Sequence, residues 1–126
     1  MPETGSIAVV GASSARHKFG NKCVRAFLHG GYRVYPVNPQ VGEIEGLPTV
    51  ATLGDLPVAP DRISIYLPPH KTRALLSKLA LYPEAEVWFN PGSADPQILA
   101  DARAAGIDVR DGCSIVDIGL SPSQFS

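Results

Sequence analysis

The sequence predicts an α/β fold built around a mostly parallel sheet, and three observations lead to this prediction. Short apolar runs alternate with segments of helical periodicity from one end of the chain to the other. The apolar runs are continuous, as in strands that are buried on both faces of a parallel sheet. Four of the runs end among Gly, Pro, Asn or Ser, residues that turn a chain. Strands joined by helices in this way form right-handed βαβ units.

Five strands are expected, at residues 7–10, 32–35, 63–67, 87–89 and 107–109. Helices are expected at residues 22–29, at 72–81 and from 95 to 105. Asp95 followed by Pro96 is a favourable helix start, because aspartate caps a helix N-terminus and proline fits the first helical position. The expected inward faces are Cys23, Val24, Phe27 and Leu28; Leu75, Leu76 and Leu79; and Ile98, Leu99, Ala102 and Ala105.

Three stretches are less regular. Residues 40–61 hold a helical turn near 53–56, residues 113–118 favour a short edge strand, and the tail at 121–124 has the composition of a frayed end. Together the elements predict a three-layer, Rossmann-like, doubly wound, mostly parallel five-stranded sheet with helices on both faces. We expect a single domain over residues 1–126, with an ordered core at about 6–118.

Composition and charge exclude several function classes. Hydrophobic residues make up 44% of the 126 residues and charged residues 18%, which indicates a folded globule rather than a disordered chain. The formal net charge of −1 provides no field that would attract nucleic acid or an anionic membrane. The apolar runs are far shorter than a membrane span, and residues 1–5 lack the features of a signal peptide, so we expect a cytoplasmic protein.

A ligand site is expected where the strands end. In open parallel sheets, ligands bind at the carboxyl ends of the strands, near the point where the strand order reverses. Four strand ends are rich in turn residues: Gly11-Ala12-Ser13, Pro36-Val37-Asn38-Pro39, Tyr66-Leu67-Pro68-Pro69 and Asn90-Pro91-Gly92.

The loop from Gly11 to Gly20 has the features of an anion site. Its small residues let a phosphate approach backbone N–H groups, and the following helix presents its positive end. Arg16, His17 and Lys18 add cationic donors, and a guanidinium can hold a phosphate through two hydrogen bonds. The alternative is an ordinary turn whose basic residues are solvated. An ordinary turn does not require three cationic residues beside small side chains, so the anion site is favoured.

This loop departs from the dinucleotide fingerprint. The pattern GxGxxG requires glycine where this chain has Ser13 and Arg16. An NAD site also places a carboxylate at the end of the second strand, whereas residues 37–39 read Val-Asn-Pro. A missing carboxylate suits a phosphorylated ribose, which coenzyme A and NADP both carry. The sequence therefore disfavours NAD.

Five stretches, in order and in register over about residues 6–116, carry a resemblance to a known family. They are residues 9–13, 18–21, 31–39, 43–48 and 90–92. They resemble the small stand-alone CoA-binding proteins, which are similar to the CoA-binding N-terminal domain of the succinyl-CoA synthetase alpha subunit.

The resemblance implies roles for matching positions. In the first loop, the residues meeting the phosphates and adenosine would be Gly11, Ala12, Ser13, Ser14, Arg16, Lys18 and Phe19. Pro36, Asn38 and Pro39 would line the nucleotide cleft, Leu67, Pro68 and Pro69 would flank the ligand, and Asn90, Pro91 and Gly92 would meet the pantetheine side. Related sequences often have a lysine at the position of Gln40, and its absence here would either weaken the affinity or leave its role to Arg16 and Lys18.

No catalytic set stands out. The chain lacks a GxSxG motif, its carboxylates fit solvated faces, and His29 suits a helix end. We expect non-catalytic binding of coenzyme A or an acyl-CoA, as a carrier, sensor or regulatory module, with no nucleic acid or membrane partner. Whether the chain forms a homodimer or binds another protein is left open. The alternative function is a small NADP-dependent oxidoreductase, for which Tyr66 or His70 would supply the general acid.

The remaining candidates are the cysteines and the aromatic residues of the fourth strand. Cys23 and Cys113 lie in no CxxC motif, so we expect two free thiols and no metal site. Cys113 follows the last strand, near the ligand edge, where a disulfide with the thiol of bound CoA is one hypothesis. Trp88 and Phe89 are expected in the core, and Tyr66 is placed to lean toward an adenine.

Overall fold

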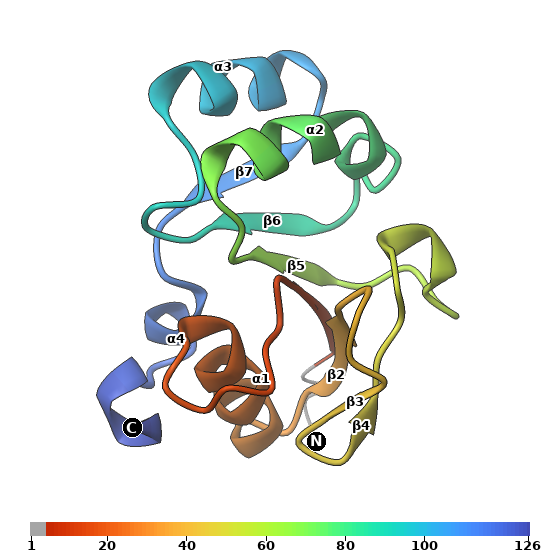
Figure 1. Ribbon diagram of the computed structural model, residues 1–126. Coiled ribbons are helices and arrows are strands. Elements are labelled where there is room, and N and C mark those ends of the chain that lie inside the picture. Colours follow the sequence, from red (N-terminus) through yellow and green to blue (C-terminus); the bar gives the residue numbers. More distant parts are fainter. Residues whose placement is uncertain (1–4) are drawn as a thin grey trace.

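The computed structural model describes residues 5–126 and places a five-stranded parallel sheet at the centre (Figure 1). The strands are β1 (Ser6–Val10), β2 (Arg33–Val37), β5 (Arg62–Ile65), β6 (Glu86–Phe89) and β7 (Asp108–Asp111). Their spatial order is β2-β1-β5-β6-β7, and every pair is parallel. A parallel bridge from Val37 to Val50 adds a rudimentary strand outside β2, which completes the Rossmann order. The predicted fold class is confirmed.

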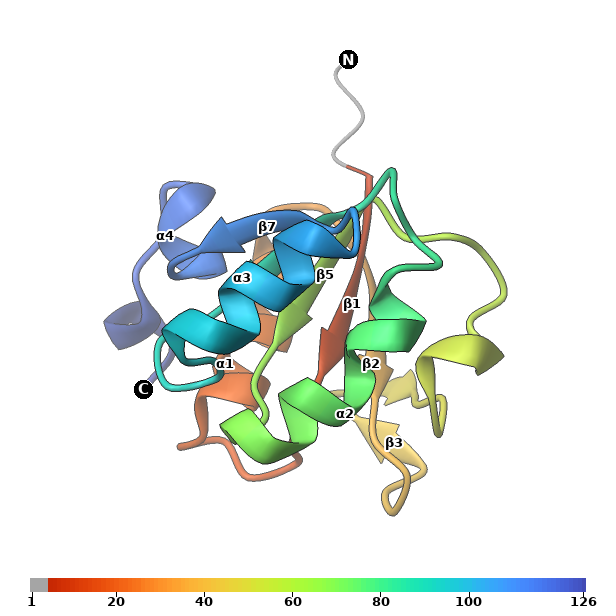
Figure 2. The ribbon, with the colours of Figure 1, turned by 90° about the horizontal axis from the view of Figure 1, so that it is seen from above.

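Helices cover both faces of the sheet. The helix α1 (Phe19–His29) and the short helix α4 (Ser114–Asp117) lie on one face, whereas α2 (Pro69–Leu79) and α3 (Pro96–Ala104) lie on the other (Figures 1 and 2). Smaller elements complete the chain: the hairpin strands β3 (Glu43–Ile44) and β4 (Leu47–Pro48), and the 3-10 turns η1 (Leu53–Asp55) and η2 (Pro122–Phe125).

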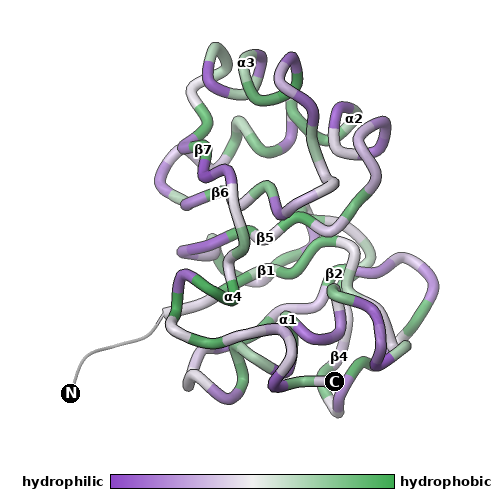
Figure 3. Tube along the Cα trace, turned by 90° about the vertical axis from the view of Figure 1, so that its left-hand side faces the viewer, coloured by the Kyte–Doolittle hydropathy of each residue, from purple (hydrophilic) through white to green (hydrophobic). Residues whose placement is uncertain are grey.

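The strand β1 shows why the apolar runs are continuous. Ile7 and Val9 are fully buried against α1, while Ala8 and Val10 pack into the core under α2 and α3. In β5, Ile63 and Ile65 continue the core under α2 and α3, whereas Ser64 is buried on the α1 side, where its Oγ lies 2.8 Å from Ser114 Oγ. Hydrophobic residues run along β1 (Figure 3). Burying each large side chain stabilises the fold by about 1.5–3 kcal/mol, and both faces of the sheet contribute.

The helix boundaries follow from capping. Asp95 accepts a hydrogen bond from the backbone N–H of Ile98 (2.8 Å), and Pro96 takes the first helical position, as predicted. The helix α2 begins at Pro69, three residues earlier than predicted, because Pro68 can serve as its N-cap and a proline at the first position sacrifices no hydrogen bond. The strand β2 likewise runs on through Pro36 to Val37 instead of stopping at 35.

Two predictions for the C-terminal part were wrong. Residues 114–117 form α4 rather than an edge strand, because Ile115 is buried against α1 and Asn90 Oδ1 accepts a hydrogen bond from the Ser114 N–H (3.0 Å). The tail is ordered as η2 rather than frayed, since Arg25 donates a hydrogen bond to the Phe125 carbonyl and Phe125 packs beside α1.

Two residues of the expected inward faces are in fact exposed. Leu28 is 38% exposed near the end of α1, and Ala105 is the exposed C-cap of α3. Trp88 and Phe89 are buried, as predicted. Across residues 5–126, the helices are all too short or too polar to cross a membrane. The same residues contain no group of three or more His, Cys, Asp or Glu side chains that could hold a metal ion.

Candidate functional site

A cleft of about 1120 Å³ opens at the carboxyl edge of the sheet. It lies where β1 and β5 are neighbours, and their following helices leave to opposite faces, α1 from β1 and α2 from β5. This is the switch point at which doubly wound sheets bind ligands. The cleft is bounded by the loop after β1, the turn after β2, residues 51–53, residues 66–68, one face of α2, residues 90–93, Cys113 and Pro122.

Two glycines fix the loop after β1 against its neighbours. Gly11 has a φ of +87°, and a Cβ there would lie 2.4 Å from the carbonyl oxygen of Tyr66. A Cβ on Gly20 would lie 2.3 Å from the carbonyl oxygen of Gly11. Only glycine permits this approach, so the start of α1 packs directly onto the end of β1.

Hydrogen bonds hold the same loop in shape. Ser13 Oγ accepts from the Ala15 N–H (3.0 Å), and Asn21 Nδ2 donates to the Ser13 carbonyl (2.9 Å). Asn38 Nδ2 donates to the Ala12 carbonyl (2.9 Å), which ties the loop to the turn after β2. The loop is therefore rigid before any ligand arrives.

The amide of Asn90 also has a structural role. It is 3% exposed, donates to Ser64 Oγ (2.8 Å) and the Ile65 carbonyl (2.9 Å), and accepts from the Ser114 N–H. It joins β5, β6 and α4 beneath the cleft. Asn38 has a similar role, because its Oδ1 accepts a hydrogen bond from the Gln40 N–H (2.7 Å). Both amides shape the walls of the cleft and are already hydrogen-bonded within the protein.

The ionisable side chains that line the cleft are basic or neutral. His17, Lys18, Lys71 and Lys78 line it, and among its described lining residues there is no Asp or Glu. Three of the four lysines of the chain lie there, and none of the seven arginines. No ion pair within residues 5–126 involves these lysines. A chain with a net charge of −1 thus presents a positive cleft.

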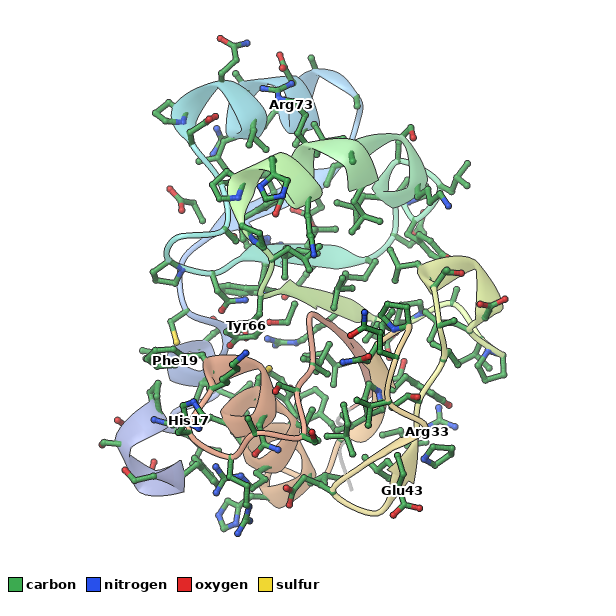
Figure 4. All side chains as sticks on the ribbon, in the orientation of Figure 1. His17, Phe19, Arg33, Glu43, Tyr66 and Arg73 are labelled. Carbon is green, nitrogen blue, oxygen red and sulfur yellow. The ribbon has the colours of Figure 1, made fainter. Side chains whose placement is uncertain are left out.

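The arginines lie outside the cleft lining, and most of them form ion pairs. Four form ion pairs: Arg16 with Glu45 (3.3 Å), Arg62 with Asp117 (2.8 Å), Arg73 with Asp101 (2.9 Å) and Arg110 with Asp108 (3.0 Å). Arg73 lies at the α2–α3 side and Arg33 at the opposite end of the molecule, whereas His17, Phe19 and Tyr66 gather beside the loop after β1 (Figure 4).

Apolar surface complements these charges. Leu53, Leu67 and Leu75 line the cleft together with prolines and alanines from the same walls. Phe19 is 57% exposed at the start of α1, and the Nζ of Lys22 lies 5.0 Å from its ring centroid. A ligand with both anionic and apolar parts would find partners for each.

Tyr66 and the two cysteines differ in how far their reactive atoms are exposed. The Tyr66 hydroxyl is buried with no hydrogen-bond partner among the described residues, and burial strongly raises the pKa of this phenol. Burial likewise raises the pKa of the Cys23 thiol to about 11, and its Sγ lies 3.7 Å from Ser64 Oγ. Cys113, in contrast, is half-buried and lines the cleft.

Comparison with known proteins identifies the family. The chain matches the family model described as CoA binding domain over residues 5–119. It belongs to that family. A conserved hypothetical protein from Pyrococcus furiosus is 32% identical, with 89% of this chain and 97% of that chain covered and a TM-score of 0.81. The protein cell-free ID.343 from Thermus thermophilus is 31% identical, with 89% and 86% covered and a TM-score of 0.81.

A longer protein contains a region that is similar to this chain. An acetyl-coenzyme A synthetase 1 of Ca. Korarchaeum cryptofilum, described as dinucleotide forming, is 25% identical with a TM-score of 0.73. The alignment covers 85% of this chain but 26% of that chain. The resemblance that the sequence carries is therefore confirmed, and this chain is similar to one part of that longer protein.

The cleft of this CoA-binding domain gathers most of the predicted site residues. Twelve of them line it: Gly11, Ala12, Ser13, Lys18, Phe19, Asn38, Pro39, Leu67, Pro68, Asn90, Pro91 and Gly92. Four others do not: Ser14, Arg16, Pro36 and Pro69. Arg16 is held by Glu45 of the β3–β4 hairpin region, and Pro36 is buried within β2. His70 also lies outside the lining.

One wall of the cleft was missed from the sequence. Lys71, Ala74, Leu75 and Lys78 form a stripe along α2 at spacings of three and four residues. The sequence predicts Leu75 only as a core-facing residue and assigns no role in the site to Lys71, Ala74 or Lys78. Two lysines seven residues apart, flanking small or apolar residues, were the signal available.

Proposed function

We propose that this protein binds coenzyme A or an acyl-CoA in the cleft and performs no chemistry on it, acting as a carrier, sensor or regulatory module. The observation that carries the proposal is the cleft itself. Among the described residues that line it, the ionisable side chains include lysines and a histidine but no carboxylate, and they stand beside apolar walls. Membership of the CoA binding domain family supports the same ligand.

The parts of the cleft fit the parts of the ligand. Its volume slightly exceeds the range of about 300–1,000 Å³ that is typical of drug-sized ligands, as a nucleotide with a long arm requires. The loop after β1, at the N-terminus of α1, would hold the pyrophosphate. Pro39 and Leu53 would flank the adenosine, while Pro68 and Gly92 would border the pantetheine arm.

Two side chains support binding without chemistry. An oxidoreductase needs an acid or base that faces its substrate. The Tyr66 hydroxyl is buried and its pKa is raised by that burial, and His70 lies outside the cleft lining. Neither residue is placed to transfer a proton to a ligand in the cleft.

Ligand-dependent melting tests the proposal. A ligand that binds only the folded state adds about 2.7 kcal/mol of stability at one hundred times its Kd, so the Tm rises. We expect a rise with CoA and acetyl-CoA, and none with NAD. A rise with NADP and none with any CoA species would replace the proposal by the oxidoreductase alternative.

The non-catalytic part is tested separately. Acetyl-CoA incubated with the protein should be recovered intact by liquid chromatography, and free CoA accumulating above a protein-free sample would contradict this part. A carrier or sensor acts on another protein or a second copy. Native mass spectrometry with and without CoA measures both the bound ligand and the oligomeric state.

A further inference from the structure

At the end of the cleft that is formed after β2, none of the described lining residues from the turn after β2 or from residues 51–53 is charged. Its lining there is Asn38, Pro39, Gln40, Thr52 and Leu53. A phosphate bound at this end would need a cation from another element. The other cations of the lining belong to the loop after β1 and to the first turn of α2, except for one residue.

That residue is Lys78. It follows Lys71 by seven residues on the same stripe of α2, which places it about 10 Å farther along the helix axis. Lys78 also borders a small hollow that is shared with Leu53 and Gly54 of η1. It therefore lies beside the end of the cleft that has no cation.

A contact between α2 and η1 fixes this arrangement. Tyr82, three residues beyond the end of α2, donates its hydroxyl hydrogen bond to the Leu53 carbonyl (3.1 Å). The carboxylate of Asp55 accepts from the N–H and Oγ1 of Thr52 (3.2 and 2.9 Å), so this acid caps η1. No ion pair in residues 5–126 neutralises Lys78.

We propose that Lys78 recognises the phosphate on the adenosine ribose and thereby sets the preference of this protein for ligands that carry that phosphate. The inference rests on the proposed function, because it assumes that CoA lies with its adenosine toward the turn after β2. Lys78 is exposed on the helix and takes no part in the core, so its replacement leaves the fold intact.

This role is tested by a thermodynamic cycle in which the Lys78 side chain and the ribose phosphate of the ligand are removed separately and together. Calorimetric titration gives the Kd of CoA and of dephospho-CoA, which lacks the ribose phosphate, for the wild type and for Lys78→Met. The wild type should bind CoA about tenfold more tightly than dephospho-CoA, the order expected for a charge-assisted contact near the surface. Lys78→Met should lose this preference and keep the affinity for dephospho-CoA.

A rescue and a control sharpen the result. Gln40→Lys, combined with Lys78→Met, places a cation at the same end from the opposite wall and should restore part of the preference. Arg103→Met removes one positive charge from the last turn of α3, away from the cleft lining, and should leave both Kd values unchanged.

Each other outcome has one meaning. If the wild type binds both ligands equally, or if Lys78→Met weakens both by the same factor, the role of Lys78 is refuted while CoA binding stands. If the wild type binds neither ligand, the proposed function fails, and the inference fails with it. The Tm of each variant without ligand confirms that a loss of affinity is not a loss of folding.

Discussion

The two long walls of the cleft are built in opposite ways. On the α1 side, residues 11–21 are fixed by close backbone contacts and by the amides of Asn21 and Asn38. On the α2 side, Lys71 and Lys78 stand on a regular helix without ion pairs among the described residues. The first is a rigid wall, held in shape by these contacts, and the second carries its charges on long side chains. A site of this kind can hold one phosphate by shape and others by charge.

The largest loss of stability is expected when a side chain is added at Gly11, where the rigid wall packs most closely. Gly11→Ala should reduce the free energy of unfolding by roughly 2–4 kcal/mol, because the methyl group meets the Tyr66 carbonyl and the φ of +87° is strained for alanine. Urea unfolding measures this loss. Gly92→Ala is the matched control, with the same φ and no atom within 4 Å of the added Cβ, and should cost only about 1–2 kcal/mol. Equal losses would show that the packing of the loop is not the cause.

The reaction of the two thiols with an alkylating reagent measures how well the α1 side of the molecule excludes solvent. Iodoacetamide at pH 8 should modify Cys113 and leave Cys23 unmodified, because Cys23 is fully buried and burial raises its pKa to about 11. Intact mass should show one adduct in the folded protein and two in urea. Bound CoA should slow the modification of Cys113 if the ligand fills that end of the cleft. Two adducts on the folded protein would mean that the α1 side opens readily.

The same thiol predicts a pH dependence. The unfolded chain releases the Cys23 proton near the ordinary thiol pKa, whereas the folded chain keeps it until about pH 11. The contribution to stability is therefore complete below about pH 9 and is lost as the pH rises toward 11. Urea midpoints measured across this range should fall more steeply for the wild type than for Cys23→Ala.

Removing charge from the cleft should weaken binding without affecting folding. Lys18→Met and Lys71→Met are each expected to raise the Kd of CoA by about tenfold, more at low salt than at high salt. Their Tm values without ligand should stay near that of the wild type, as is usual for surface positions. Arg33→Met, at an exposed site outside the cleft lining, is the charge-matched control. An equal loss with Arg33→Met would indicate a diffuse field rather than contacts in the cleft.

The smallest effect is expected for Arg16→Ala. The Arg16 side chain is 65% exposed and pairs with Glu45, and an exposed ion pair contributes only about 0–1 kcal/mol to stability. Because Arg16 lies outside the cleft lining, we expect the Kd of CoA to change by less than about threefold. A larger change would mean that Arg16 leaves Glu45 when the ligand binds, and the rigid wall would then be less fixed than the hydrogen bonds indicate.

Local patterns were sufficient to predict most of the fold and much of the site. The apolar runs of β1 and β5, the Asp95 cap and the turn residues at four strand ends are each encoded within a few neighbouring positions. Since carboxyl ends of parallel strands meet at one edge, the sequence also predicted that the loop after β1 and Asn90 would share a site. The departures came where a partner lies far along the chain.

The sequence by itself determined the βαβ alternation, the resemblance to CoA-binding proteins and the small residues of the first loop. Only the tertiary structure decided that residues 114–117 form a helix, that Arg16 pairs with Glu45, and that Lys71 and Lys78 line the cleft. The physical reason is the distance along the sequence between the residues that interact. Strand and helix periodicity, caps and turns depend on neighbouring residues. The partner of a charged side chain is set by which surfaces the packed sheet brings together.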